Sequence, residues 1–169
     1  MPQYRLQTVL EMREKAEEDA KQAFADAMRV FEGEQKKLKG MQADLEKRKV
    51  DRKAKVNAYM TEVMAKGVGV GGLAQMNRFE DRLKADEAQL QLDIDRQKES
   101  VNQAEKEVET KRFEMAEAAK EKKAIEKHKD NWKKEIRKER MAKEELNQEE
   151  IGNNLHLQRV RAQEKSEKS

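Results

Sequence analysis

A heptad repeat of apolar residues, broken by a single run of glycines, is the feature that most limits how this chain can fold. Counting alternately four and three residues from Met76 to Ile136 gives 18 positions. Twelve of them are apolar, although only 36% of the chain is hydrophobic: Met76, Leu83, Leu90, Ile94, Val101, Ala104, Val108, Met115, Ala118, Ile125, Trp132 and Ile136. This spacing keeps the apolar side chains on one stripe of an α-helix, as in a coiled coil.

The first part of the chain carries the same repeat in a less regular form. Phe24, Phe31, Leu38, Leu45 and Tyr59 are separated by multiples of seven residues. The only proline is Pro2, at a position where a helix can begin, and residues with high helix propensity dominate the remainder. With 43% charged and 4% aromatic residues, the chain has too little apolar surface for a rounded core. Long helices are therefore the expected structure.

The glycine run divides the chain into segments. Residues 67–72 read Gly-Val-Gly-Val-Gly-Gly, which is the one strong helix breaker. We expect a first coiled-coil helix at 4–66, a glycine-rich hairpin loop at 67–72, a second coiled-coil helix at 73–160 and a polar, disordered tail at 161–169. The second helix would overhang the first by about 25 residues. Its exposed apolar residues, Leu146, Ile151 and Leu155, would be available to another protein.

Pairing arithmetic favours an intramolecular hairpin. A fold about the middle of residues 67–72 brings together positions whose numbers add to about 139, which predicts the pairs Leu45–Ile94 and Val63–Met76. Polar residues that interrupt the repeat would also face each other. Arg52 would face Glu87, and Gln42 would face Gln97. The sequence therefore predicts an all-α fold, an antiparallel two-helix coiled-coil hairpin formed by one chain.

Charge supports the same pairing. Residues 35–55 carry a net charge of +6, while 84–104, which would face them, carry −2. Residues 120–140 carry +5 and residues 1–19 carry −2. A parallel homodimer would place like charges together, which is unfavourable. We therefore expect a monomer.

Catalysis and cofactor binding are not expected. Gly67, Gly69 and Gly72 match a dinucleotide-binding glycine pattern, but that motif needs a preceding strand, and no strand pattern is present. His128 and His156 are the only histidines and lie too far apart on one helix to share a metal ion. A two-helix coiled coil also offers no cleft in which carboxylates could be desolvated for acid–base chemistry. We expect no enzyme activity, no metal and no cofactor.

Other classes of partner are disfavoured for similar reasons. No apolar run is long enough to span a bilayer, no secretory signal is expected, and the absence of cysteine suits a reducing cytosol. The basic stretches 36–55 and 120–140 are interrupted by acidic residues and flanked by few aromatics, which argues against nucleic-acid binding. Trp132, by its position, should pack with Tyr4, Leu6 and Leu10. We expect four exposed large apolar groups near the loop, which are more than one seam can bury: Tyr59, Met60, Met64 and Phe79.

The opening Tyr4-Arg-Leu6-Gln-Thr-Val9-Leu10-Glu-Met-Arg13 and the closing His128-Lys-Asp-Asn-Trp132-Lys-Lys-Glu resemble the FliJ/YscO family of type III secretion proteins. The closing stretch, on to Asn154-Leu155-His156, is most similar to the YscO/CdsO-type members of virulence systems. The resemblance implies a cytoplasmic bacterial protein, peripheral at the inner-membrane export apparatus. It implies a central stalk that binds and stimulates the hexameric export ATPase, and that engages the export gate and secretion chaperones.

The resemblance also implies two sets of binding residues. The ATPase-facing end, with both termini, would be formed by Tyr4, Leu6, Val9, Leu10, Arg13, Trp132, Ile136, Arg137 and Arg140. The gate or chaperone side would be formed by Tyr59, Met60 and Phe79. Two alternatives stay open from the residues alone. One is a structural coiled-coil spacer or scaffold with no ATPase partner, and the other is a nucleic-acid-binding hairpin, whose binding would fall steeply with salt.

Overall fold

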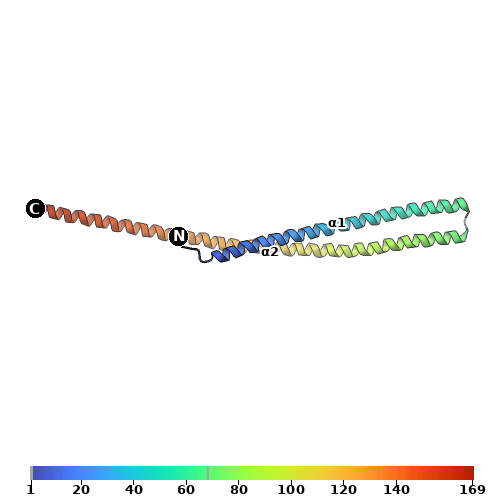
Figure 1. Cartoon of the computed structure of the whole chain (residues 1–169), viewed down its shortest axis with the longest axis horizontal. Helices are drawn as coiled ribbons and strands as arrows, with labels where there is room; N and C mark the ends of the chain where they lie inside the picture. Colours follow the sequence, from blue (N-terminus) through green and yellow to red (C-terminus); the bar gives the residue numbers. More distant parts are fainter. Residues whose placement is uncertain (1, 68) are drawn as a thin grey trace. The chain divides into compact units, whose positions relative to one another are not determined.

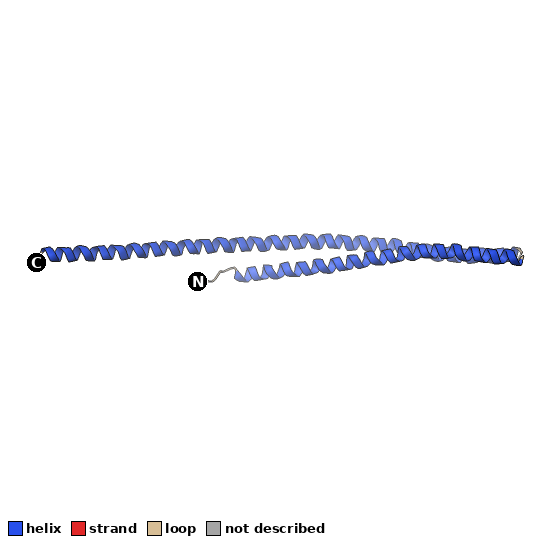
Figure 2. Ribbon diagram, turned by 90° about the horizontal axis from the view of Figure 1, so that it is seen from above, coloured by secondary structure: helices blue, strands red, loops and turns tan. Residues whose placement is uncertain are grey.

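The computed structural model describes residues 2–67 and 69–169, and it contains two long α-helices that pack against each other (Figure 1). Helix α1 spans Gln7–Lys66 and helix α2 spans Val70–Glu167. Helix makes up nearly all of the described chain, and no strand occurs in it (Figure 2). The expected all-α helical hairpin is confirmed.

The helix ends differ from the expected bounds by a few residues. Helix α1 begins at Gln7 instead of residue 4, because Arg5 and Leu6 form a turn that the Gln7 amide closes with a 3.1 Å hydrogen bond to the Tyr4 carbonyl. At its other end Gly67 has a φ of 63°, a left-handed conformation that glycine adopts without steric cost. Val68, part of the expected loop, lies outside the described residues.

Helix α2 is longer than expected at both ends. It begins at Val70 because the Gly72 amide donates to the Gly69 carbonyl at 3.0 Å, so the last glycines of the expected loop are helical. It continues to Glu167, through residues expected to form a tail. Glycine lowers helix propensity without forbidding a helix, and charged residues such as Glu164 and Lys165 have high propensity.

The described chain divides into two compact units, and both helices contribute to each. Unit 1 comprises Met1–Glu17 and Ala118–Ser169, and unit 2 comprises Glu18–Glu117. The core of unit 2 is a cluster of Leu45, Leu90 and Ile94, against which Leu38 and Met41 pack. Ile94 is only 1% exposed. The expected meeting of Leu45 with Ile94 is thus confirmed.

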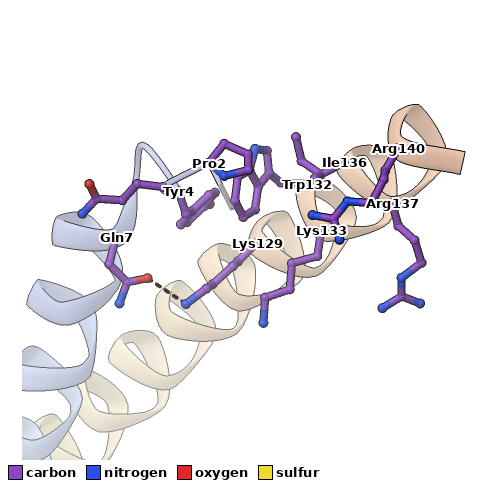
Figure 3. Close-up of a pocket in the computed structure, with 10 residues that line it drawn as sticks. Pro2, Tyr4, Gln7, Lys129, Trp132, Lys133, Ile136, Arg137 and Arg140 are labelled. Carbon is purple, nitrogen blue, oxygen red and sulfur yellow. Dashed lines mark hydrogen bonds between the residues drawn. The ribbon is translucent and has the colours of Figure 1, made fainter. Parts of the chain in front are cut away.

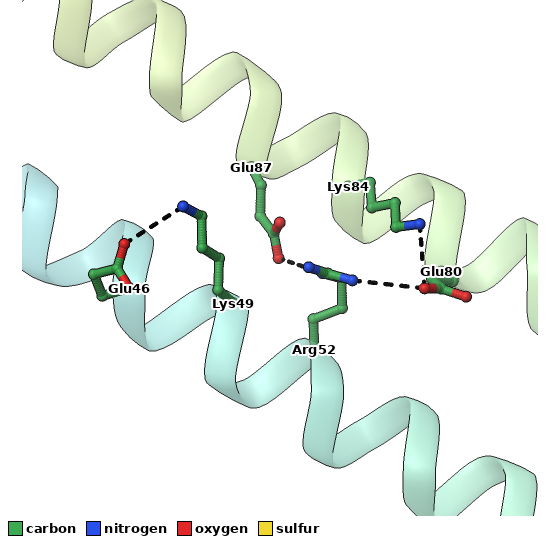
Figure 4. Close-up of polar contacts among 6 residues, drawn as sticks. All are labelled: Glu46, Lys49, Arg52, Glu80, Lys84 and Glu87. Atoms are coloured by element: carbon green, nitrogen blue, oxygen red, sulfur yellow. Dashed lines mark hydrogen bonds and ion pairs between the residues drawn. The ribbon is translucent and has the colours of Figure 1, made fainter.

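A polar network interrupts the apolar seam of unit 2. The Nε atom of Arg52 donates to Glu87 Oε1 at 2.7 Å, and a second guanidinium nitrogen lies 3.5 Å from Glu80 (Figure 4). Lys84 Nζ in turn lies 3.3 Å from Glu80. Glu87 is a buried charged residue of the seam, and this network pairs its charge. The expected pair Arg52–Glu87 is confirmed.

The expected pair Gln42–Gln97 is wrong. Gln97 is buried, and its Nε2 atom donates to the Glu34 carbonyl at 3.1 Å and to the Glu34 carboxylate. A buried amide needs a hydrogen-bond partner, and Glu34 supplies it, whereas Gln42 is exposed. Glu34 lies about two helical turns before Gln42 on α1. The difference is not a shift of the whole register, since Arg52 and Glu87 meet as expected.

Candidate functional site: two exposed protein-binding surfaces

Tyr4 anchors the start of the chain on α2 in unit 1. Its side chain is buried, and its ring centroid lies 5.1 Å from that of Trp132. Its hydroxyl and His128 Nδ1 form a 2.6 Å hydrogen bond. Aromatic pairs at this separation add about 0.5–1.5 kcal/mol to the burial of their surface. The expected packing of Trp132 against Tyr4 is therefore confirmed.

Polar contacts fix α1 against α2 next to this aromatic pair. Lys129 Nζ donates to Gln7 Oε1 at 2.7 Å and lies 5.9 Å from the Tyr4 ring centroid. Further into unit 1, Lys122 Nζ lies 3.2 Å from a Glu17 carboxylate oxygen. The hydrogen bond and negative charge of Glu17 raise the pKa of the Lys122 ammonium above its usual value. These contacts hold α1 against α2 at the end of unit 1, so the surface there is formed without a partner.

This end of unit 1 contains a pocket of about 380 Å³, which we call the Trp132 pocket (Figure 3). Tyr4, Trp132 and Ile136 supply apolar surface. Its polar lining contains four cationic side chains and no acidic one: Lys129, Lys133, Arg137 and Arg140. An apolar wall bordered by a few charged groups is a common form of binding site.

The residues expected to form an ATPase-facing end fall into three groups. Five of them line the Trp132 pocket: Tyr4, Trp132, Ile136, Arg137 and Arg140. Leu6 lines an adjoining hollow with His128 and Trp132. The other three serve packing or pairing: Leu10 is buried, Val9 is half-buried, and Arg13 pairs with Glu121 at 2.5 Å.

Several residues of this surface were missed by the sequence reasoning. Pro2, Lys129 and Lys133 line the pocket, and His128 holds the Tyr4 hydroxyl. The spacing of Lys129, Lys133 and Arg137 at intervals of four places them on one face of a helix. That spacing was the available signal, but it is common in a chain rich in charge.

Beyond the Trp132 pocket, α2 has no covering partner within unit 1. Residues 137–169 are exposed except Val160, which is half-buried. They include the large apolar side chains Met141, Leu146, Ile151, Leu155 and Leu157. The exposed apolar residues expected on the overhang, Leu146, Ile151 and Leu155, are therefore present as exposed side chains.

A second surface lies in unit 2, next to the turn. The rings of Tyr59 and Phe79 stack with centroids 6.3 Å apart and line a hollow of about 370 Å³ together with Gln75, Arg78 and Arg82. Tyr59, Met60 and Phe79 are half-buried, since two of them cover each other. The expectation that this whole group is exposed holds only for Met64, which is 76% exposed.

Within the described part of the chain, no group of three His, Cys, Asp or Glu side chains could hold a metal ion. Over the same residues, no helix has an apolar stretch long enough to cross a membrane. Both surfaces instead combine aromatic side chains with arginine. That composition is enriched in protein–protein interfaces.

Comparisons with known proteins agree with this description. A family model described as YscO-like protein matches residues 1–162. Among solved structures, the chain is similar to that of a proposed YscO homologue, CT670 from Chlamydia trachomatis. The two share 28% sequence identity with a TM-score of 0.77, over 92% of this chain and 96% of the other. No curated protein matches the chain.

Proposed function

The chain belongs to the YscO-like family of proteins associated with type III secretion, and from this premise we propose that it is a non-enzymatic central stalk of the export machinery. In this role it binds and stimulates the hexameric export ATPase in the bacterial cytoplasm, at the inner-membrane export apparatus. It also engages the export gate and secretion chaperones. The observation that carries the proposal is the family match over residues 1–162.

The geometry of unit 1 supports the ATPase as the partner of this end. The Trp132 pocket and the uncovered part of α2 together present apolar and cationic side chains that no part of unit 1 covers. A two-helix coiled coil has no sixfold symmetry, so in a hexameric ring it contacts each subunit differently. Such unequal contacts stabilise different conformations in neighbouring subunits and thereby couple their active sites.

Trp132→Ala tests the ATPase-binding role. We expect affinity for the cognate ATPase to fall at least about tenfold, because the change removes a large aromatic anchor from the pocket. Stimulation of ATP hydrolysis should fall with it, and Leu6→Ala should weaken both to a smaller extent. Surface plasmon resonance and a phosphate-release assay measure the two effects.

Phe113→Ala is the matched control, because Phe113 is an exposed aromatic residue of α2 in unit 2. It should leave affinity and stimulation unchanged. Circular dichroism must show that all variants keep the helical content of the parent. ATPase affinity that is equal for Trp132→Ala and Phe113→Ala would contradict the proposal.

The surface next to the turn is the proposed gate or chaperone side. Phe79→Ala should reduce binding of the gate's cytosolic domain or of a chaperone at least about tenfold, since it removes the ring that stacks on Tyr59. Stimulation of the ATPase should stay unchanged. Pull-down with each purified partner measures the effect, with Leu92→Ala as control, since Leu92 is exposed in unit 2 and is not part of this surface. If Phe79→Ala binds gate and chaperones as the parent does, this assignment is wrong.

A further inference from the structure

We propose that the Trp132 pocket binds an acidic segment of the partner protein that carries one large apolar side chain. The apolar side chain would pack against Tyr4, Trp132 and Ile136, and flanking carboxylates would pair with Lys133, Arg137 and Arg140. The inference rests on the proposed function in one respect, because it assigns this acidic segment to the export ATPase.

The cations of the pocket favour an acidic ligand. Lys129 already donates to Gln7, so its charge is held at the pocket wall. Lys133, Arg137 and Arg140 make no ion pair or side-chain hydrogen bond with any described residue. Other cations of α2, such as Lys134 and Lys138, also make no ion pair with a described residue, but these three line one hollow that has no acidic side chain. Three unpaired cations around one hollow therefore favour a ligand with several negative charges.

The apolar wall favours a large apolar side chain in the same ligand. Trp132 and Ile136 are half-buried on α2, and their uncovered surfaces face the pocket beside the Tyr4 ring (Figure 3). A volume of about 380 Å³ is sufficient for one large side chain of the ligand and parts of the ligand residues next to it. A purely ionic ligand would leave this apolar surface in water. An acidic peptide segment with an apolar residue at its centre satisfies both parts of the lining.

The single tryptophan of the chain makes occupancy directly measurable, because Trp132 lies in the pocket. The probes are three capped pentapeptides: Glu-Glu-Phe-Glu-Glu, Gln-Gln-Phe-Gln-Gln and Glu-Glu-Gly-Glu-Glu. We expect the first to change Trp132 fluorescence with an affinity at least about tenfold higher than either of the others. Added salt should weaken its binding, since the ion pairs are near the surface. Equal binding of all three peptides, or no binding of the first, overturns the inference.

A pair of charge variants separates the pocket from general electrostatics. Arg137→Gln/Arg140→Gln removes two cations from the pocket, and Lys134→Gln/Lys138→Gln removes two that do not line it. The first variant should bind the acidic phenylalanine peptide and the ATPase hexamer at least about tenfold more weakly than the parent, and the second should bind as the parent does. Equal weakening by both variants would show a diffuse attraction and overturn the inference.

The same measurements distinguish this inference from the function on which it rests. If the ATPase binds and is stimulated equally with and without Arg137 and Arg140, the stalk function survives and the pocket inference fails. If the acidic peptide binds but the ATPase does not, the stalk function fails and the assignment of the segment to the ATPase fails with it. Light scattering of the chain alone tests whether a second copy occupies the pocket, since residues 144–150 of that copy are also acidic. A dimer lost in Arg137→Gln/Arg140→Gln would overturn the inference in favour of self-association.

Discussion

We expect Glu87→Leu to lower the free energy of unfolding by about 3–5 kcal/mol, which is the usual cost of removing one partner from a buried ion pair. The side chains of Arg52 and Glu87 are only 17% and 11% exposed, so water screens their interaction poorly. Without Glu87, the Arg52 guanidinium keeps only the 3.5 Å contact with Glu80. Urea denaturation followed by circular dichroism measures the change.

Two further variants test the reason for this loss. Arg52→Leu/Glu87→Leu should recover most of the lost stability, because an apolar pair of similar volume avoids the unpaired charge. Glu46→Leu is the control, since Glu46 pairs with Lys49 on the surface at 3.4 Å (Figure 4) and surface pairs contribute about 0–1 kcal/mol. A double variant as unstable as Glu87→Leu alone would show that the loss does not come from the unpaired arginine.

The second large effect concerns the apolar core of unit 2. Ile94→Ala should lower the free energy of unfolding by about 2–5 kcal/mol, because it removes three buried carbon atoms and leaves a cavity beside Leu45 and Leu90. Ile94 is the one large side chain of the described residues that is fully buried. The urea midpoint of the full chain gives the measurement.

Leu92→Ala is its matched control, two residues away on the same helix and 53% exposed. It should change stability by less than about 0.5 kcal/mol. A loss for Leu92→Ala equal to that for Ile94→Ala would mean that the two helices do not pack along the predicted stripe.

Periodicity was sufficient to predict the fold because a coiled coil buries little besides its repeat. The 4-3 spacing that begins at Met76 identified the buried stripe, and the buried residues Leu90, Ile94, Ala104 and Val108 all belong to it. The polar position Glu87 was predicted to face Arg52, since opposite charges at facing positions are a pattern of sequence alone. These contacts depend on spacing and charge, and both can be read from the sequence alone.

The bounds of the turn could not be predicted in the same way. They depend on the conformation of each glycine, and glycine allows both helical and left-handed conformations. Gly67 takes the left-handed conformation, whereas Gly71 and Gly72 continue into α2. The bounds of the helices at the turn therefore differ from the predicted ones. The predicted partner of Gln97 is wrong for a separate reason, because its buried amide bonds to Glu34, whereas the predicted partner of Arg52 is right.

The candidate sites were predictable only in part. Tyr4 and Trp132 stood out because aromatic residues are rare in this chain, and the structure brings them together. The roles of His128 and Lys129 depend on the turn at Arg5 and Leu6, which no periodic pattern specifies. Near the turn, Tyr59 and Phe79 were identified as large apolar residues, but their stacking on each other was not foreseen.

The central claim is that this chain acts as a stalk for the export ATPase, and titration of the ATPase with the chain tests it most directly. Hydrolysis rate and hexamer content are measured on the same samples, by phosphate release and by gel filtration with light scattering. The proposal predicts stimulation or stabilised hexamers that saturate near one chain per hexamer. No change in rate or assembly at any ratio would contradict it and would leave a structural coiled-coil spacer as the better interpretation.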